Sequence, residues 1–405
     1  MGQPPTPLEE AQAQLLALAV PLPPEWVAAD EAAGRYLAQP VIARRTQPGA
    51  ALSAMDGYAV TQGDLAGPWR VVGESAAGHP YAGTMVAGDA VRISTGAVLP
   101  ADAAAVIVQE DLERDGEQLV LTGEAPSRPA KHIRPRGLDF VEGAPVLAAG
   151  TRIGPAQLAL ALSAGHGRLS VHRRPSVLVM DSGDELSADP EACQEHQIPA
   201  SNGAMLAAMA RALSCHVRRV GPVADDMDAL AAAFAQAEEA DVIVTSGGAS
   251  VGDHDLIKPA LEAWGANIDF WRVAIKPGKP ILVATRQSGG KRQIILGLPG
   301  NPVSSHVTAY LFMLPLLRRM LGAAKPLPLV TTLSLREPLP ANGGRRTFLR
   351  AVTDGTLVSA QAVQDSSALA SLAASNVLID RASNAPAVAA GEPVLCLWLD
   401  NGGTA

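Results

Sequence analysis

The sequence predicts a multidomain protein in which a central α/β domain is combined with separate β domains. The chain has 405 residues, 48% of them hydrophobic, which is more than a single core needs. Between residues 177 and 321, apolar strand-like runs alternate with helical patterns, as in a parallel sheet covered on both faces. The stretches before and after this segment hold short apolar runs separated by glycine and proline, a pattern typical of small β domains.

Composition excludes several classes of partner. A formal net charge of −8 and an aromatic content of 3% argue against a nucleic acid or an anionic membrane as partner. The three cysteines form no CxxC pair, so zinc ribbons and disulfide frameworks have no support. No secretory leader is recognisable, and the longest apolar stretch, Tyr310–Leu317, is too short to span a membrane. We therefore expect a cytoplasmic protein in which an anionic ligand needs a local basic site.

The first residues predict two helices. Apolar side chains recur at three- and four-residue spacing from Leu8 to Leu18, after a threonine, a proline and an acid suited to a helix start. Pro21 ends this helix. A second short helix is expected over Trp26–Ala33, with Gly34 as its end.

The pattern of the following region predicts a small β domain and, after it, a helix. Its expected strands are Tyr58–Val60, Trp69–Val72, Ala90–Ile93, Val106–Gln109 and Leu119–Thr122, and its expected helix is Pro155–Ala164.

The central segment carries the α/β alternation. Its expected strands are Val177–Met180, Val217–Val220, Val242–Thr245, Ile268–Val273, Ile281–Ala284 and Ile294–Leu296. Its expected helices are Asn202–Leu213, Asp228–Glu239, one that begins near Asp255, and Val303–Leu321. Ligands of such sheets bind beyond the carboxyl ends of the strands, so chemistry is expected in the loops after Met180, Thr245 and Leu296. After a linker at Lys325–Pro328, a last β domain is expected, with strands Val330–Leu335, Thr347–Val352 and Val394–Leu399.

Two of the expected strand-end loops are suited to phosphate and metal. Thr245–Asp255 is rich in glycine, which lets backbone N–H groups approach an anion, although a tight turn with aspartate caps would read the same way. Asp181–Leu186 brings Asp184 and Glu185 to the same edge, where they could hold Mg²⁺ or form only an exposed acidic turn. Asp225 and Asp226 fit either a site or the cap of the following helix.

Three further motifs are candidates. Lys276–Pro280, preceded by Arg272, is a compact basic turn suited to an oxyanion, or else a solvated turn. Gly297–Pro302 is by itself only a rigid loop between a strand and a helix. Asp56 and Thr95 lie in turns of the early β region, where a local Asx turn is the simpler explanation. The histidines show no metal-binding spacing and no nucleophile elbow is present.

The ordered set of motifs resembles the molybdopterin molybdenumtransferase family, of the MoeA and gephyrin E-domain type. The matching segments are Ser53–Val60, Ile93–Pro100, Gly150–Gly165, Ser182–Leu186, Ser246–Asp255, Lys276–Pro280, Leu298–Ser304 and Ser366–Ile379. The resemblance implies an elongated L-shaped protomer of four domains. These are a discontinuous domain of residues 1–45 and 141–170, an inserted β domain of 46–140, an α/β domain of 171–325 similar to molybdopterin adenylyltransferase, and a β-barrel-like domain of 326–405.

The same resemblance implies an activity and partners. The implied substrates are adenylated molybdopterin and molybdate, with Mg²⁺-dependent hydrolysis and release of AMP as the molybdenum cofactor is completed. It implies a homodimer whose site lies at the subunit interface, with molybdopterin adenylyltransferase and molybdoenzyme maturation proteins as further partners. The alternatives are a non-catalytic molybdopterin-binding or scaffold protein of the same fold, and an adenylyltransferase.

The resemblance also implies site residues, residue by residue. The implied catalytic set is Asp56, Thr95, Glu185, Asp226 and Asp255, of which Glu185, Asp226 and Asp255 are the expected metal ligands. The implied substrate-binding set is Ser246, Gly247, Gly248, Arg272, Lys276, Lys279, Pro299, Pro302, Arg346, Arg350, Ser366 and Ser371. The chain departs from the family pattern at Asp181, where serine or threonine is usual, and at Ala200, where an acid is usual.

Overall fold

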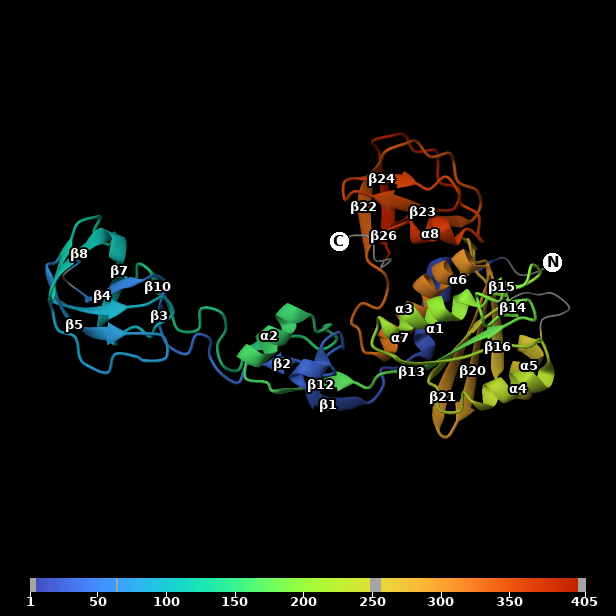
Figure 1. Ribbon diagram of the computed structural model, residues 1–405, viewed down its shortest axis with the longest axis horizontal. Coiled ribbons are helices and arrows are strands. Elements are labelled where there is room, and N and C mark those ends of the chain that lie inside the picture. Colours follow the sequence, from blue (N-terminus) through green and yellow to red (C-terminus); the bar gives the residue numbers. More distant parts are fainter. Residues whose placement is uncertain (1–4, 63–64, 248–255, 400–405) are drawn as a thin grey trace.

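The protomer is elongated, with three bodies in a row and a fourth above one end, which gives an L shape (Figure 1). The computed structural model describes residues 5–62, 65–247 and 256–399. A β body lies at one end, a small mixed body in the middle, and an α/β body at the other end beneath a β-barrel. None of the described helices is long and apolar enough to cross a membrane.

The β body is a six-stranded sheet of order β7-β4-β6-β5-β9-β8. Its strands are β4 (Gly57–Thr61), β5 (Trp69–Ser75), β6 (Asp89–Ile93), β7 (Ala103–Val108), β8 (Leu112–Asp115) and β9 (Gln118–Leu121), so the five strands expected here are confirmed. Tyr58, Val60, Trp69 and Leu119 fill its core. Gly57 is required where β4 meets β7, because a Cβ atom there would lie 1.9 Å from the carbonyl oxygen of Ile107.

The middle body joins two segments that are far apart in the chain. Strand β1 (Pro24–Ala28) pairs with β12 (Arg168–His172), and β2 (Val41–Ile42) pairs with β11 (Pro145–Leu147), next to helix α2 (Pro155–Ser163). The helix expected over Trp26–Ala33 is therefore wrong: β1 is followed only by a short 3₁₀ turn, η1 (Ala29–Ala32). The partner strand comes from much later in the chain, and local periodicity cannot reveal it.

The α/β body contains a six-stranded sheet of order β16-β13-β17-β21-β20-β18. Its strands are β13 (Ser176–Ser182), β16 (His216–Val223), β17 (Val242–Ser246), β18 (Asn267–Arg272), β20 (Pro280–Ser288) and β21 (Lys291–Leu298). The four strands β16, β13, β17 and β21 are parallel, as predicted. Strand β20 runs antiparallel to both neighbours, because Gly289 and Gly290, at φ 55° and 81°, close a tight hairpin to β21.

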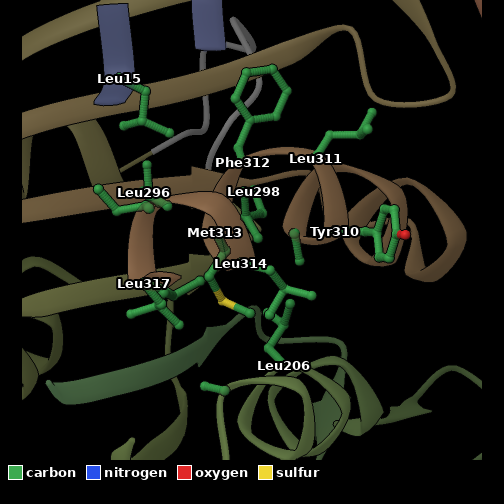
Figure 2. Close-up of a cluster of buried hydrophobic side chains, with 14 of the residues drawn as sticks. Leu15, Leu206, Leu296, Leu298, Tyr310, Leu311, Phe312, Met313, Leu314 and Leu317 are labelled. Atoms are coloured by element: carbon green, nitrogen blue, oxygen red, sulfur yellow. The ribbon is translucent and has the colours of Figure 1, made fainter. Parts of the chain in front are cut away.

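Helices cover both faces of this sheet. One face carries α1 (Leu8–Leu18), α3 (Ser201–Arg211) and a continuous helix made of α6 (Pro302–Thr308), a π-helical turn η3 (Ala309–Met313) and α7 (Leu314–Met320). The other face carries α4 (Met227–Ala235) and α5 (Ile257–Ala263). Figure 2 shows Leu15 of α1 and Leu206 of α3 in one cluster with the strand residues Leu296 and Leu298 and the long helix.

The C-terminal body is a closed five-stranded barrel, in which β23-β24-β22-β26-β25 returns to β23. Its elements are β22 (Val330–Leu335), β23 (Arg346–Thr353), β24 (Leu357–Ala360), α8 (Leu369–Ala373), β25 (Val377–Arg381) and β26 (Pro393–Trp398). Strand β19 (Ile275–Lys276) of the α/β body pairs with β23 and joins the two bodies. The remaining short elements are β3 (Leu52–Ser53) with β10 (Ile133–Arg134), β14 (Leu186–Ser187) with β15 (Ile198–Pro199), and η2 (Gln109–Asp111).

A buried glutamine stabilises the long helix at its π-helical turn. Pro315 has no N–H group to donate to the carbonyl of Leu311, four residues before it. Gln12 of α1 replaces the missing donor, because its side-chain amide donates to that carbonyl oxygen at 2.8 Å in a buried setting. Helix α1 is thereby tied to the core of the α/β body.

We expect Gln12→Ala to lower the free energy of unfolding by about 1–3 kcal/mol, because a buried carbonyl oxygen would lose its partner. Gln14→Ala, on the exposed side of the same helix, should change it by less than about 0.5 kcal/mol. Urea denaturation of the two variants measures the difference. Equal midpoints for both would contradict the role given to Gln12.

Candidate functional site

The carboxyl ends of the parallel strands meet at one edge of the α/β sheet, as the sequence predicted. The sheet order places the ends of β16 and β13 on one side, those of β17 and β21 in the middle, and the turn between β18 and β20 on the other side. Along this edge the side chains change from acidic to basic.

A glycine loop lies in the middle of the edge. Ser246 ends β17 and is buried, and the N–H of Gly247 donates to the carbonyl oxygen of Leu298 at 3.1 Å. Gly247 has a φ of +96°, and a Cβ atom there would lie 3.0 Å from the carbonyl oxygen of Ser182. The loops after β13, β17 and β21 therefore converge on Gly247. The predicted site residues Gly248 and Asp255 lie outside the described residues.

Three acidic residues lie on the loops at the acidic end, Asp184 and Glu185 after β13 and Asp225 after β16. The hydroxyl of Ser182 donates to Oδ1 of Asp225 at 2.9 Å, and the N–H of Asp225 donates to Oδ1 of Asp184 at 3.0 Å. The carboxylate of Glu185 folds back over Gly183, where a Cβ atom would lie 2.5 Å from Oε2 of Glu185. Asp184, Glu185 and Asp225 are all exposed.

Asp226 has a different position from its neighbour. Its Oδ1 accepts the N–H groups of Asp228 and Ala229, both at 3.0 Å, so Asp226 caps the start of α4. The structure thus places Asp225 against the acidic loop and Asp226 at the helix start. Within the described ranges, no group of three or more His, Cys, Asp or Glu side chains could hold a metal ion.

A buried aspartate supports the same edge. Asp181, at the end of β13, is 2% exposed; its carboxylate accepts the N–H of Gly203 in the first turn of α3 and lies 3.4 Å from the guanidinium of Arg219. Burial raises the pKa of Asp181, although both of these partners lower it. Ala200 offers no side-chain cap to α3, so Asp181 supplies the carboxylate that Ala200 lacks. The side chain of Asn202 in that turn donates to the carbonyl oxygen of Gly300 at 2.6 Å.

The basic turn occupies the other end of the edge. Arg272 ends β18, and the N–H of Val273 donates to the carbonyl oxygen of Lys279 at 2.8 Å, which closes the turn. Gly278, at φ +96°, fits against α6, since a Cβ atom would lie 2.3 Å from a methyl group of Thr308. Arg272, Lys276 and Lys279 are exposed. None of these three cations is paired with a carboxylate in the part of the chain that the structure describes.

A cavity of about 360 Å³ opens where the basic turn meets the barrel. Lys276, Arg345 and Arg381 line it, and its described lining contains no carboxylate. Arg381 is 4% exposed and donates to the carbonyl oxygen of Pro340 at 3.2 Å, while its Nη1 has no hydrogen-bond partner among the described residues. Three cations without a counter-charge favour an oxyanion as the occupant.

Two arginines that the sequence predicted as substrate ligands are engaged within the protein. Arg346 donates from Nε to Oδ1 of Asp380 at 2.7 Å and also contacts the carboxylate of Glu9, and the hydrogen bond to Asp380 raises its pKa further above the usual range. Arg350 is buried, and its guanidinium donates to Oγ of Ser371 at 3.3 Å and to the carbonyl oxygen of Val363. Burial lowers the pKa of Arg350.

Sequence reasoning did not find Arg345 and Arg381, which line the cavity instead. Adjacent residues of a strand point to opposite faces. If Arg346 faces the protein, its neighbour Arg345 is therefore expected on the other face, and this signal was present in the sequence. The other predicted residues of this region form the seam between the bodies. Pro302 begins α6, Pro299 is half-buried in the loop before it, and the carbonyl oxygen of Ser366 accepts the N–H of Val303 at 3.0 Å.

Asp56 and Thr95 are brought together in the β body. Oδ1 of Asp56 accepts the N–H of Thr95 at 2.7 Å, and both side chains are exposed. Figure 1 places this body at the opposite end of the protomer from the sheet edge. A single chain therefore does not unite Asp56 with the basic turn.

A second, larger hollow lies beside the barrel, and like the smaller cavity it has no carboxylate in its described lining. It is an apolar groove of about 970 Å³ between α3, the long helix and the barrel, and Met205, Met209, Tyr310, Leu314 and Trp398 are among its lining residues. Most of its lining is apolar and is suited to burying apolar surface, although Arg152, Arg318 and Lys325 line it as well. The smaller cavity differs from it in lying beside the basic turn of the sheet edge.

Family models divide the chain in the same order as its bodies. Residues 6–165 match the MoeA N-terminal region (domain I and II), residues 178–319 match a model described as "probable molybdopterin binding domain", and residues 332–399 match the MoeA C-terminal region (domain IV). Fold and sheet edge thus define a multidomain protein built around a domain of the molybdopterin-binding class.

Relatives with known names extend over almost the whole chain. The molybdopterin molybdenumtransferase of Haemophilus influenzae is 33% identical over 397 residues, which cover 96% of this chain and 97% of the relative. Molybdopterin molybdenumtransferase 2 of Mycobacterium tuberculosis is 34% identical, with coverage of 89% and 91%. A crystal structure of the molybdopterin biosynthesis MoeA protein of Pyrococcus horikoshii superposes with a TM-score of 0.82 at 25% identity, covering 98% and 100%. The chain belongs to the molybdopterin molybdenumtransferase family.

Proposed function

We propose that this protein inserts molybdenum from molybdate into adenylated molybdopterin, with hydrolysis of the phosphoanhydride and release of AMP. One observation carries the proposal: carboxylates, a glycine loop and cations that pair with no carboxylate among the described residues follow one another along a single sheet edge. Adenylated molybdopterin and molybdate are both anionic, so they need these cations in a chain with a net charge of −8. Membership of the family supports the same reaction.

In this proposal, different basic residues bind the phosphate groups and the molybdate. Arg272 and Lys279, together with the backbone of the loop that begins at Ser246 and Gly247, hold phosphate oxygens. Lys276, Arg345 and Arg381 hold molybdate in the cavity beside the barrel. Both anions are then presented at the same edge, which orients the reactants before bond cleavage.

In this proposal Mg²⁺ binds at the acidic end of the edge. Mg²⁺ is usually bound by one or two carboxylates with substrate phosphates completing its coordination, so the exposed carboxylates of Glu185 and Asp225 support the proposal without a group of three ligands. Glu185 and Asp255 are the proposed ligands, with Asp225 in place of Asp226, whose Oδ1 caps α4. The bound ion would neutralise charge on the phosphate oxygens. Asp184 and Asp225 orient the attacking water.

The active unit is a homodimer in this proposal. Asp56 and Thr95 lie far from the sheet edge of their own chain, so a second copy would supply them. The apolar groove beside α3 offers surface for the contact. The protein would act in the cytoplasm, receiving its substrate from a molybdopterin adenylyltransferase and passing its product to molybdoenzyme maturation proteins.

The function is tested by mixing purified protein with adenylated molybdopterin, molybdate and Mg²⁺ and measuring AMP. We expect AMP release that requires both molybdate and the divalent ion. Tight molybdopterin binding without AMP would instead favour a binding or scaffold protein, and consumption of ATP with non-adenylated molybdopterin would favour an adenylyltransferase.

We expect Arg345→Ala to raise the KM for molybdate about tenfold with little change in kcat, because it removes one charge-assisted contact to the bound anion. Arg336→Ala is the matched control, an exposed arginine of the same barrel that pairs with Asp354 away from the cavity. Steady-state kinetics at varied molybdate measure both values. An Arg345 variant with the KM of the control would remove the cavity from the proposed site.

A further inference from the structure

We propose that Asn342 is a positioning residue that holds the cations of the oxyanion cavity in place, an inference that rests on the proposed function of that cavity. Asn342 lines the cavity, in the loop that connects the barrel strands β22 and β23. It carries no charge, and we give it no direct role in the reaction.

The side-chain amide of Asn342 contacts the backbone of both cavity arginines. Its Nδ2 lies 2.9 Å from the carbonyl oxygen of Arg345 and 3.0 Å from that of Arg381. The same Nδ2 donates to the carbonyl oxygen of Ala382 at 2.7 Å. Its Oδ1 accepts the hydroxyl of Thr347 at 2.9 Å. One amide thus ties the loop before β23 to the end of β25.

Lys276, the third cation, is linked to Asn342 through Thr347. Thr347 of β23 is paired in register with Lys276 of β19. The guanidinium of Arg381 donates to the carbonyl oxygen of Pro340, two residues before Asn342. Asn342 and its immediate partners therefore contact the segments that carry all three cations, in addition to the strand pairing that holds Lys276 and Arg381.

The loop would not hold this shape by local preference. Gly343 and Gly344 stand between Asn342 and Arg345, and a Cβ atom on Gly343 would touch nothing. Two consecutive glycines carry a large conformational entropy, which the contacts of Asn342 must offset. Without the amide, the loop keeps the backbone hydrogen bonds of Asn342 and Gly343 to residues 385 and 384, but the carbonyl oxygen of Arg345 loses its contact with the amide. Ordering Arg345 when the anion binds then carries a cost that reduces affinity. The expected effect is therefore on binding and not on the chemical step.

The barrel contains a matched control. Asn376 makes the same kind of backbone contacts at the far end of β23, where its Nδ2 donates to the carbonyl oxygen of Thr353 and its Oδ1 accepts the Thr353 N–H, both at 2.9 Å. A purely structural asparagine should behave like Asn376.

The test compares Asn342→Ala and Asn376→Ala in the full chain. Thermal unfolding reports stability, calorimetric titration with molybdate reports affinity, and steady-state kinetics separate KM from kcat. Both variants should lose stability, but only Asn342→Ala should weaken molybdate binding about tenfold, the equivalent of one hydrogen bond, and raise KM at constant kcat. Asn342→Ser keeps one hydroxyl donor, so it should fall between native and alanine. It also serves as the test variant if Asn342→Ala does not fold.

Equal molybdate affinity in the Asn342 and Asn376 variants would overturn the inference, as would a loss confined to kcat. Arg345→Ala separates this failure from failure of the proposed site. If Arg345→Ala weakens molybdate binding while the Asn342 variants do not, only the positioning role is wrong. If neither changes binding, the cavity itself is not the oxyanion site.

Discussion

Asp225→Asn should slow AMP release about 10²-fold, whereas Asp226→Asn should leave it within about twofold of the native rate. The two residues are adjacent, but only the carboxylate of Asp225 accepts the hydroxyl of Ser182 at the strand ends, while the backbone N–H of Asp225 donates to Asp184. The asparagine at 225 keeps the shape and removes the charge needed to orient water and hold a cation. At 226 asparagine caps a helix about as well as aspartate, so α4 should be unaffected.

The measurement is single-turnover AMP release at saturating substrate, with the unfolding midpoint of each variant as a check on the fold. Both variants should unfold within a few degrees of the native protein. A large loss of rate in Asp226→Asn with none in Asp225→Asn would reverse our placement of the two carboxylates. The native rate in both variants would exclude this acidic loop from the reaction.

Acidification from pH 6.5 to pH 4 should cost about 3 kcal/mol of stability through His306 alone. His306 of α6 is 6% exposed and its Nδ1 has no hydrogen-bond partner within the described residues, so burial lowers its pKa from 6.5 to about 4. In the unfolded chain the imidazole binds a proton below pH 6.5, while in the folded chain it stays neutral down to about pH 4. The unfolded state therefore binds more protons across this window, and stability falls as pH falls.

Urea denaturation of the native protein and of His306→Leu, at several pH values between 7 and 4, isolates this contribution. The variant should show a shallower loss of stability with acid, and the difference between the two curves should grow as pH falls from 6.5. The exposed His216, changed to glutamine, is the control and should leave the curve unchanged. Parallel curves for native and His306→Leu would show that His306 does not titrate as proposed.

Local patterns predicted most elements because their causes are local. The apolar spacing of Leu8–Leu18 produces α1, and the short β-branched runs of the central segment produce β13, β17 and β21. The same reasoning failed at Trp26–Ala33, where β1 depends on pairing with β12. It also could not foresee that β20 would run antiparallel within the sheet, since direction follows from the hairpin at Gly289 and Gly290.

The sequence by itself determined the family, the chemical types of residue at each strand-end loop, and the excess of acid that makes local cations necessary. Only the tertiary structure distinguished neighbours of like charge: Asp225 from Asp226, and Arg345 from Arg346. The physical reason is that adjacent residues share composition and local propensity but point in different directions. Which one faces the proposed site depends on a helix start, a strand pairing or an ion pair with Asp380, and each of these involves contacts with other parts of the fold.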